Sequence, residues 1–483
     1  MLEIYSEGYG TIPGYELYMI GFHDLRAGFD FILDYGIPKF VYSAINAIAV
    51  HLPPDIITAL STMPNVRYIE KDAYAFITGF PSPYPVSVMA QTPSWGFNKI
   101  RAAEVHAAGN KGAGIRVCVI DSGVDPTHED LVANLKGGYN FVDNTPTLKD
   151  DCGHGTHVCG IIAATYNDIG VLGVAPEAFL YACRGLSNNS GSCTGSYADL
   201  NACIQWAIDN SMQVVNMSWG GGPYSQTMND LLKAAYNSGI VPVASAGNSG
   251  KSKPDTCGYP AKYNPVIAVA ATNQDDLSAS TSSQGPGVEV AAPGVKILST
   301  VPKDCSMYCD TSGYMLLSGT SMASPHVAGL AALILKARPA FTVDQVRGAL
   351  NAGVTDLGDP GRDPVYGFGR IDAVKAVSIT SPPPPPPPMS AKQCQTHGTE
   401  PPTCDPMDVK GYDECDTYCD CPYKTRWICG IRPDEPLRCG LGKDTYCHPK
   451  GYDSLKECSD CCKAGTCKPP ECTPLGCSFE MGG

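Results

Sequence analysis

The chain has 483 residues, of which 43% are hydrophobic and 17% are charged. This balance allows large buried cores and excludes a disordered protein, and at about 150 residues per domain the length predicts about three domains. The net charge of −14 excludes the strongly basic face of a typical nucleic-acid-binding protein.

The first eighty residues mix strand-like and helix-like segments. β-Branched and aromatic residues dominate Tyr15 to Phe22, Val41 to His51 and Val66 to Ile69, whereas Pro54 to Met63 has a helical pattern. This mixture predicts a small α+β domain. The first ten residues lack the basic and apolar regions of a signal peptide, and no apolar run reaches the roughly 18 residues of a membrane span. We therefore expect a soluble protein.

Between residues 100 and 378, strand-like runs alternate with longer helix-like stretches. The strand-like runs are Ile115 to Ile120, Val214 to Met217, Val241 to Ser245 and Val266 to Ala270. The helix-like stretches are Tyr197 to Asp209 and Ser321 to Lys336. This alternation predicts an α/β domain with a parallel sheet flanked by helices.

A run of seven prolines, Pro382 to Pro388, follows this region. Because such a run forms a semi-rigid polyproline II spacer, it predicts a domain boundary. Fourteen of the 23 cysteines come after residue 390. This density indicates a small disulfide-rich domain that forms in an oxidising compartment, so we expect a secreted protein, although the pairing of these cysteines stays open.

Three short motifs carry residues suited to nucleophilic catalysis. Asp121 ends the apolar run in Val-Cys-Val-Ile-Asp-Ser-Gly, His154 lies in Gly-His-Gly-Thr-His-Val, and Ser321 lies in Gly-Thr-Ser-Met-Ala-Ser-Pro-His. A serine hydroxyl is a weak nucleophile that needs a histidine as its base, and the imidazole needs a carboxylate to orient it. Taken singly, these residues are more often a turn former, a structural histidine and a helix cap.

In this order the three motifs resemble the subtilisin family of serine peptidases, over residues 90 to 378. The resemblance implies that Asp121, His154 and Ser321 form a catalytic triad, and that His157, Ser324 and His326 have packing or capping roles. Asn248, in Ala-Gly-Asn-Ser-Gly, matches the family's side-chain donor to the oxyanion, with the N–H of Ser321 as the second donor.

The same resemblance implies where a peptide substrate binds. The peptide would lie as a strand between two segments, Thr194-Gly195-Ser196 and Ser218-Trp219-Gly220. The residues expected to line the first pocket are Gly220, Gly221, Ala246, Gly247 and Gly258. These small residues, without an acidic one among them, predict a preference for a large apolar side chain before the cut.

A calcium site is also implied by the resemblance. Its oxygen ligands would come from Gln91, Asp130, Thr165, Asn167, Ile169 and Val171, and such oxygen-only sets suit Ca²⁺. The alternative is an ordinary Asn-Asp surface turn.

The catalytic region has nine cysteines. Cys152 and Cys193 resemble a bridge of some family members, and Cys305 and Cys309 are close enough in sequence to close a small loop. We expect Cys118, Cys159 and Cys183, which lie in apolar runs, to be buried free thiols.

The resemblance also predicts the domain plan. Residues 1–89 would form an inhibitory propeptide domain, 90–380 the catalytic domain, 381–389 a proline-rich linker and 390–483 a Cys-rich domain. Self-cleavage is expected at Met89–Ala90, with Tyr84 to Val88 lying as a strand in the cleft, and the cut would let Gln91 reach the calcium site. The alternative is a permanently attached N-terminal domain.

Together these patterns predict a secreted, monomeric serine endopeptidase that acts on polypeptides, is inhibited by its own propeptide and binds no nucleic acid. Two other classes of protein stay open. One is an inactive binding protein that uses the subtilisin-like region as a scaffold, and the other is an adhesive extracellular protein centred on residues 389–483. No sequence feature indicates a ligand for the Cys-rich domain.

Overall fold

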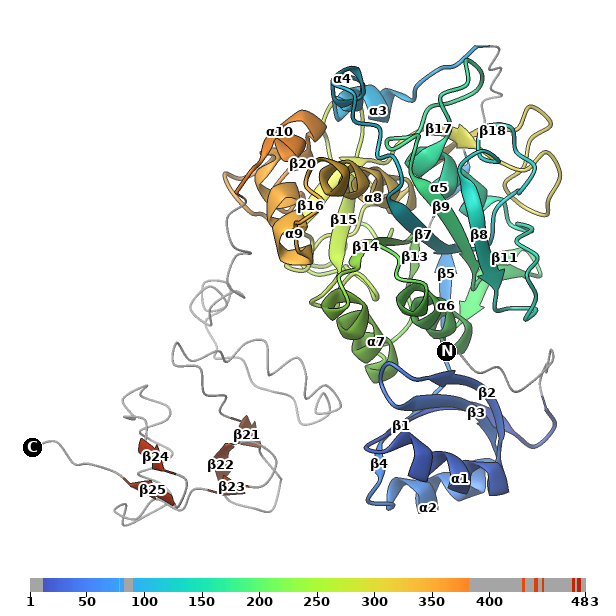
Figure 1. The fold of residues 1–483 in the computed structure, drawn as a ribbon, viewed down its shortest axis with the longest axis vertical. Helices are drawn as coiled ribbons and strands as arrows, with labels where there is room; N and C mark the ends of the chain where they lie inside the picture. The colour runs from blue at the N-terminus through green and yellow to red at the C-terminus, as the bar shows by residue number, and fades with distance from the viewer. Residues whose placement is uncertain are drawn as a thin grey trace, which may run out of the picture. The chain divides into compact units, whose positions relative to one another are not determined.

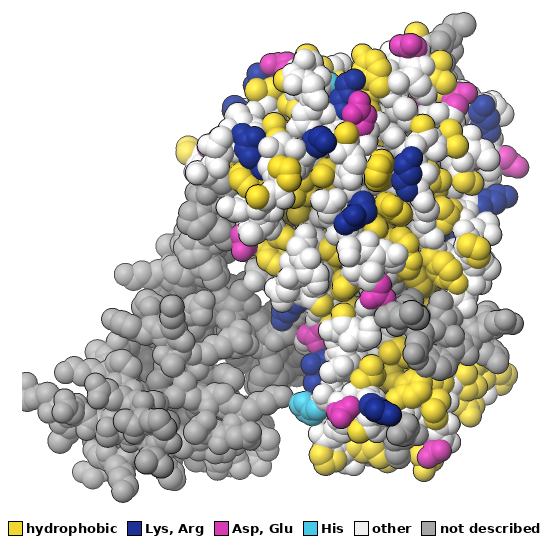
Figure 2. Space-filling model, viewed as in Figure 1, with side chains coloured by type: hydrophobic (Ala, Val, Ile, Leu, Met, Phe, Trp, Pro, Cys, Tyr) yellow, Lys and Arg dark blue, Asp and Glu magenta, His cyan; other side chains and the backbone are white. Residues whose placement is uncertain are grey.

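The computed structural model describes residues 12–77, 79–81 and 90–381, and beyond them only the backbone of five short strands. The chain divides into two compact units, residues 1–385 and 386–483 (Figure 1). Among the described residues, no helix has the length and apolarity to cross a membrane. On the face shown in Figure 2, the described Lys and Arg side chains are scattered among Asp and Glu side chains.

The N-terminal region, residues 12–77, contains a four-stranded antiparallel sheet in the order β2-β3-β1-β4. Its elements are β1 Glu16–Phe22, α1 Leu25–Tyr35, β2 Ile37–Tyr42, β3 Ala47–Leu52, η1 Pro54–Ile56, α2 Ile57–Ser61, β4 Val66–Lys71 and β5 Tyr74–Ile77. The predicted α+β domain is therefore confirmed, except that the predicted Val41 to His51 segment is two strands joined by a turn. Helix α1, which the sequence did not predict, begins after Asp24, whose carboxylate accepts the N–H groups of its first turn.

The two faces of this small sheet pack against different partners. Ile20 and Val50 pack with Ile32 and Leu60 of the two helices. Met19 and Tyr42, on the opposite face, belong to the core of the larger region that follows. Alternating side chains along a strand point to opposite faces, so the sheet is buried on both sides.

The central region, residues 90–381, is built on a nine-stranded sheet in the order β19-β20-β16-β15-β14-β12-β7-β9-β8. All neighbouring strands are parallel except β19 and β20 at one edge. The strands are β7 Arg116–Asp121, β8 Leu135–Asn140, β9 Phe179–Arg184, β12 Val214–Met217, β14 Val241–Ser245, β15 Ile267–Thr272, β16 Val290–Pro293, β19 Val354–Thr355 and β20 Arg370–Ile371. This confirms the predicted α/β fold.

Helices cover both faces of this sheet (Figure 1). The helices of the central region are α3 Trp95–Lys99, α4 Ala102–Ala107, α5 His154–Ala163, α6 Tyr197–Asp209, α7 Gln226–Asn237, α8 Thr320–Ala337, α9 Val343–Ala352 and α10 Ala373–Ser378. Val117 and Val119 of β7 pack in one core with α5, α8 and α9. Cys118 and Ile120, the alternate residues, pack in the other core with α6 and α7.

Two smaller sheets join the N-terminal and central regions. One has the order β10-β11-β5-β13 and the other β17-β18-β6. The added strands are β6 Phe80–Pro81, β10 Ser187–Asn189, β11 Ser192–Ser196, β13 Trp219–Gly220, β17 Ile297–Thr300 and β18 Tyr314–Ser318. In each sheet, a strand from before residue 90 pairs with strands from the central region.

The second unit is described only by its strands β21 Ile428–Gly430, β22 Arg438–Leu441, β23 Thr445–Tyr446, β24 Glu471–Thr473 and β25 Gly476–Ser478. They form a three-stranded sheet and a two-stranded one, both antiparallel. The predicted cysteine framework lies outside the described side chains, and so does the proline run Pro382 to Pro388.

Candidate active site

Asp121 is the last residue of β7, at the point where the order of the large sheet changes direction. After β7 the chain forms β8 and then β9 on one side of it, and it later forms β12 on the other side. In parallel sheets, ligand sites form outside the carboxyl ends of strands at such a point. The N–H of Ser122 donates to Asp121 Oδ1 over 2.8 Å, which fixes this buried carboxylate.

His154 is the first residue of α5, and it reaches Asp121 from there. Its Nδ1 lies 2.8 Å from Asp121 Oδ1. The turn before it is held by Asp150, whose carboxylate accepts the N–H groups of Gly153 and Thr156. Gly153 has φ 86°, a conformation that favours glycine. The other ring nitrogen, Nε2, is buried and has no hydrogen-bond partner among the described atoms.

Ser321 is the second residue of the 18-residue helix α8 and is fully buried. Its hydroxyl donates to the carbonyl oxygen of Ser218 over 2.9 Å rather than to His154. The histidine ring nevertheless lies beside the start of α8. A Cβ at Gly79 would lie 3.4 Å from His154 Nε2 and 3.8 Å from Sδ of Met322, the residue after Ser321. Serine–histidine bonds are often loose until a transition state forms.

Asn248 faces the same helix start from the loop after β14. Its Oδ1 accepts the N–H and the hydroxyl of Thr320, each over 3.0 Å. A carboxamide has its oxygen and its NH₂ group on opposite sides, so these two bonds orient the NH₂ group away from Thr320. The arrangement fixes a side-chain amide next to the N-terminus of α8, where the helix dipole favours negative charge.

The neighbouring histidines in these motifs have structural partners. His157 Nε2 lies 3.1 Å from the carbonyl oxygens of Ile297 and Met315, and His326 Nδ1 lies 2.8 Å from that of Met322. Burial lowers the pKa of His157 to about 3 and that of His326 to about 4. Both are therefore neutral at physiological pH and are unsuited to exchanging protons there.

The two segments predicted to bind substrate flank one strand, and that strand belongs to the chain itself. β5 pairs antiparallel with β11 through Phe76 and Thr194, and with β13 through Ile77 and Trp219. In Figure 1 this strand lies between segments that come more than a hundred residues later. Tyr84 to Val88, the segment expected to lie there, is outside the described residues; the described strand between the two segments is β5, ten residues upstream. Only two residues separate β4 from β5, so the chain enters the cleft directly.

The glycines predicted for the first pocket gather beside β13. The N–H of Gly221 donates to Tyr259 O and that of Gly258 to Ala246 O. A Cβ at Gly258 would lie 3.8 Å from Gly221 N, and one at Gly247 would lie 4.0 Å from Gly258 N. Gly220 is next in sequence, so the structure brings the whole predicted set together.

The central region of the chain matches a known family of proteins. The model of the subtilase family matches residues 112–369, which is more than half of the chain. The chain belongs to the subtilase family. It is 42% identical over 337 residues to subtilisin E of Bacillus subtilis (strain 168), covering 69% of this chain and 81% of that protein. It is 39% identical over 335 residues to M-protease of Shouchella clausii (strain KSM-K16), covering 69% and 80%. This subtilase is therefore a serine endopeptidase, a hydrolase that acts on polypeptides.

The predicted calcium ligands converge in this subtilase on the side chain of Gln91. Its Nε2 lies 2.7 Å from Thr165 O, 3.1 Å from Val171 O and 3.2 Å from Asn167 Oδ1. Asp130 joins the group through Asn167 Nδ2 and the N–H of Val171. Ile169 contacts this group through its backbone N–H, which donates a hydrogen bond to Asn167 Oδ1.

This donor set fits a hard cation. Three oxygens around one point, with a carboxylate behind them, suit Ca²⁺, and the reversed amide of Gln91 would supply a further oxygen. Burial raises the pKa of Asp130, and a cation would offset that cost of desolvation. The described residues contain no cluster of three or more His, Cys, Asp or Glu side chains that would hold a metal. Most of the oxygens here are instead backbone and amide oxygens.

Gln91 already lies at this group in the uncut chain. The N–H groups of Gln91 and Thr92 donate to the carbonyl oxygens of Asp168 and Gly170. The expectation that cleavage would be needed to bring Gln91 there is wrong. The nine residues between Pro81 and Gln91 can span about 30 Å when extended, so the chain reaches both sites at once.

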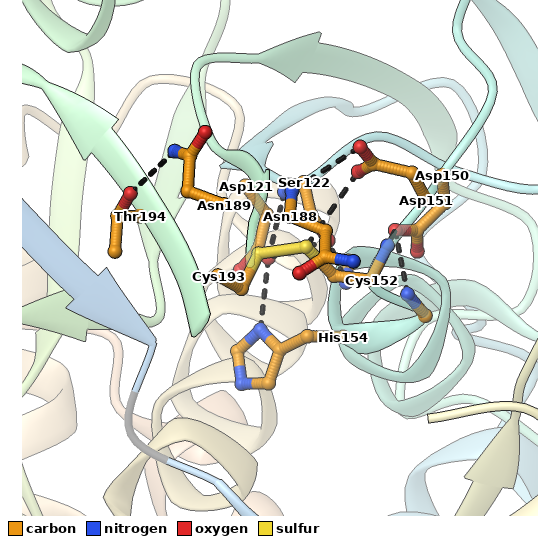
Figure 3. The surroundings of a disulfide bond; sticks show 12 residues. Asp121, Ser122, Asp150, Asp151, Cys152, His154, Asn188, Asn189, Cys193 and Thr194 are labelled. Carbon is orange, nitrogen blue, oxygen red and sulfur yellow. Dashed lines mark hydrogen bonds and ion pairs between the residues drawn. A yellow bond between two sulfur atoms is a disulfide. The ribbon is translucent and has the colours of Figure 1, made fainter. Parts of the chain in front are cut away.

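A disulfide joins Cys152 to Cys193, as the family resemblance implied. Figure 3 shows it between the loop that carries His154 and the segment that carries Thr194. Asp151 adds to this link, because it accepts from Arg184 over 2.9 Å and from the N–H of Asn188 over 3.2 Å. The bridge therefore ties the loop that carries His154 to the segment that carries Thr194.

The remaining cysteines of the central region are free thiols. Cys118, Cys159 and Cys183 are buried and unbridged, as predicted. Cys305 and Cys309 are also unbridged, so the predicted small loop is not closed by a disulfide. Two backbone bonds hold this loop instead, from the N–H of Ser306 to Asp151 O and from the N–H of Tyr308 to Cys152 O.

Three residues of the site were not predicted from the sequence. Glu70 accepts the N–H and hydroxyl of Thr227 at the start of α7, and Asp72 accepts the N–H of Ala198 at the start of α6. The hydroxyl of Tyr308 donates to Gly79 O over 2.8 Å. An acidic pair near a strand end is a weak signal for helix capping when the helices lie far away in sequence.

Proposed function

We propose that this subtilase is a secreted serine endopeptidase made as a self-inhibited zymogen, with Asp121, His154 and Ser321 as its triad. The observation that carries the proposal is the position of β5, which lies in the chain's own cleft as a peptide substrate would. A strand held there by main-chain pairing on both sides blocks other peptides. The proposed domain plan is an inhibitory propeptide over 1–89, a catalytic domain over 90–380, a linker over 381–389 and a Cys-rich domain over 390–483.

The proposed reaction follows from the positions of the three side chains. His154 takes the proton of the Ser321 hydroxyl, and Ser321 Oγ attacks the carbonyl carbon of the substrate. Asp121, bonded to Nδ1, keeps Nε2 as the nitrogen that accepts the proton, and it stabilises the imidazolium that forms. His154 then gives this proton to the leaving amine, and water hydrolyses the resulting ester.

Charge on the substrate oxygen is stabilised at the start of α8. The proposed donors are the side-chain NH₂ of Asn248 and the N–H of Ser321. Both lie where the helix N-terminus favours negative charge. Because these donors are held in place before the substrate arrives, little reorganisation is needed during the reaction.

Two further properties belong to the proposal. The glycine-lined pocket supports a preference for large apolar side chains before the cut. The oxygens around Gln91 support a structural calcium ion, held by the ligand set Gln91, Asp130, Thr165, Asn167, Ile169 and Val171. When bound, the ion would neutralise Asp130 and tie together two segments of the central region.

Replacement of the nucleophile tests the function. Ser321→Ala should reduce peptide hydrolysis on the order of 10⁶-fold and abolish labelling by a serine-directed phosphonate. Ser238→Ala, at the exposed end of α7, is the matched control and should behave as the unaltered protein. Hydrolysis that persists in a correctly folded Ser321→Ala protein would contradict the triad. An unaltered protein that neither hydrolyses peptides nor takes the label would favour an inactive binding protein.

A further inference from the structure

We propose that the first self-cleavage breaks the peptide bond at the amide nitrogen of Gly79, and that residues 79–89 stay in front of the catalytic domain until a separate, later cut. This inference rests on the proposed zymogen function. It differs from a single cut at Met89–Ala90, because the structure holds the chain in the cleft at a different place.

The chain before Gly79 runs towards the nucleophile. Ile77 pairs with Trp219, the residue next to Ser218. The carbonyl oxygen of Ser218 accepts the hydroxyl of Ser321. The direction of β5 therefore takes the chain from the substrate-binding segments to Ser321 within two residues of Ile77.

The chain from Gly79 onwards is held on the leaving side of the site. Phe80 and Pro81 form β6, which pairs antiparallel with Ser318 and Leu317 of β18. Ser318 lies three residues before Ser321. Tyr308, whose ring is tilted against His154 at a centroid distance of 6.3 Å, donates its hydroxyl to Gly79 O. Strand pairing therefore holds both arms of the chain, on opposite sides of the nucleophile.

Gly79 itself lies against the base. A Cβ at this position would lie 3.2 Å from His154 Cδ2 and 3.4 Å from Nε2, which is tighter than ordinary contact for the nearer atom. Without a Cβ, the backbone can approach the ring closely. His154 Nε2, buried and without a partner among the described atoms, is therefore next to the residue whose nitrogen must receive a proton.

The proposed step proceeds through an ester of Ser321. Ser321 Oγ bonds to the carbonyl carbon that precedes Gly79, and the C–N bond to Gly79 breaks. The proton taken from Ser321 passes through His154 to the Gly79 nitrogen, which leaves as an amine. Water then hydrolyses the ester, which restores the serine and gives fragments 1–78 and 79–483.

The bonds of Gln91 and Thr92 to the loop at 168–170 are made in the uncut chain, so this first cut does not depend on moving them. The new N-terminus would begin Gly-Phe-Pro-Ser, eleven residues before Ala90. Held by β18 and Tyr308, it would still cover the leaving side of the cleft. A separate cut near Ala90 would then be needed to clear that side.

Time-resolved mapping of the first fragments tests the inference. The full chain is allowed to process, quenched in acid at intervals, and its fragments are measured by intact mass and N-terminal sequencing. The first new N-terminus should be Gly79, and any terminus near Ala90 should appear later. A first product that begins at Ala90, with no Gly79 species before it, would overturn the proposal while leaving the triad intact.

Two variants add an independent readout in the same full chain. Gly79→Val should slow the first cut at least tenfold, because its side chain would meet His154, whereas Met89→Asp should leave the first cut unchanged. If Met89→Asp blocks the first cut and Gly79→Val does not, the proposal is wrong. Ser321→Ala separates the position of the first cut from the proposed function. Self-cleavage that persists in this variant would contradict the proposed function itself. The order of fragments in the unaltered chain decides the matter even if Gly79→Val fails to fold.

Discussion

Asn248, the proposed donor to the oxyanion, is held in place by two hydrogen bonds. Its oxygen is occupied by the N–H and hydroxyl of Thr320, so the side chain cannot rotate without losing two hydrogen bonds. A donor held rigidly in a site that excludes water stabilises developing charge far better than a mobile one. Thr320, the first residue of α8, holds the side chain of Asn248 in this orientation before a substrate binds.

Replacement of Asn248 should therefore reduce turnover with little effect on substrate binding. We expect Asn248→Ala to lower kcat about 10²-fold to 10³-fold, because one oxyanion donor is lost. Steady-state kinetics on a peptide substrate give kcat and KM separately. Asn248→Asp is the informative control, since it keeps the oxygen that Thr320 binds but has no NH₂ group. An aspartate variant with nearly unaltered kcat would contradict the donor role.

At the scale of elements, the link from β4 to β5 fastens the N-terminal region to the central one. Asp72 lies in this link, and its carboxylate accepts the N–H of Ala198 over 3.0 Å. Burial and, to a smaller extent, nearby Asp199 raise the pKa of Asp72 to about 7, although the hydrogen bond from Ala198 and the charge of Lys39 act in the opposite direction. Lys39 itself is paired with Asp199 over 2.6 Å. Docking therefore places a carboxyl group where its charged form is disfavoured.

We expect the cleaved N-terminal fragment to be held less tightly as the pH rises from about 4 to about 7. The docked carboxyl group binds its proton more tightly than the free one, so deprotonation favours release, by at most tenfold per pH unit. Above pH 7 the group is ionised in both states, and this contribution becomes constant. Gel filtration of processed protein at several pH values measures the release. Asp72→Asn should flatten the dependence, whereas Asp55→Asn, at an exposed site, should not; equal slopes in all three would contradict the assignment.

The proposed calcium site also belongs to the scale of elements, because its ligands join the segment at Gln91 to the loop after α5. We expect the ion to raise the free energy of unfolding by about 2.7 kcal/mol when its free concentration is 100 times the dissociation constant. Melting temperatures in excess calcium and in chelator, starting from calcium-free protein, measure this effect. Asn167→Ala should abolish the difference, and Asn237→Ala, at the exposed end of α7, should keep it. Equal melting temperatures for the unaltered protein would remove the site.

At the scale of the whole molecule, the proposed catalytic residues lie within the first compact unit, residues 1–385. The hydrogen bonds and strand pairs described for the site all join residues of that unit. The seven prolines that follow Ser381 are unsuited to pairing with a central strand or extending a helix. Among the described residues, the site is built from side chains and strands of the first unit alone.

A chain that ends after Ser381 should hydrolyse short peptides with a kcat/KM within about twofold of that of the full chain. The physical reason is that neither the triad nor the cleft draws a described contact from beyond the linker. Parallel kinetics on the two purified proteins, both allowed to process, provide the measurement. A loss of more than tenfold, with the shortened chain correctly folded, would show that the second unit supports the active site. Short peptides are used so that binding of a larger substrate by the tail does not contribute.

The sequence by itself determined the fold class and brought out the candidate site. Asp121 at a strand end, His154 after a glycine and Ser321 before a helix are specified by a few neighbouring residues, because strand and helix ends have local patterns. The buried free thiols of Cys118, Cys159 and Cys183 were also predictable, because each lies in a run of apolar residues. Helix α1 was not, since its cap at Asp24 is a weak signal without the sheet that it packs on.

Only the tertiary structure decided how the N-terminal region uses the cleft. The bond between Asp72 and Ala198 joins residues 126 positions apart, and that between Tyr308 and Gly79 joins residues 229 apart. No local pattern encodes such a pair, because the partners meet only after the sheet and its helices have formed. The sequence could match the end of the propeptide to Ala90, but the register of β5 and β6 depends on which residues fit between the strands of the folded enzyme.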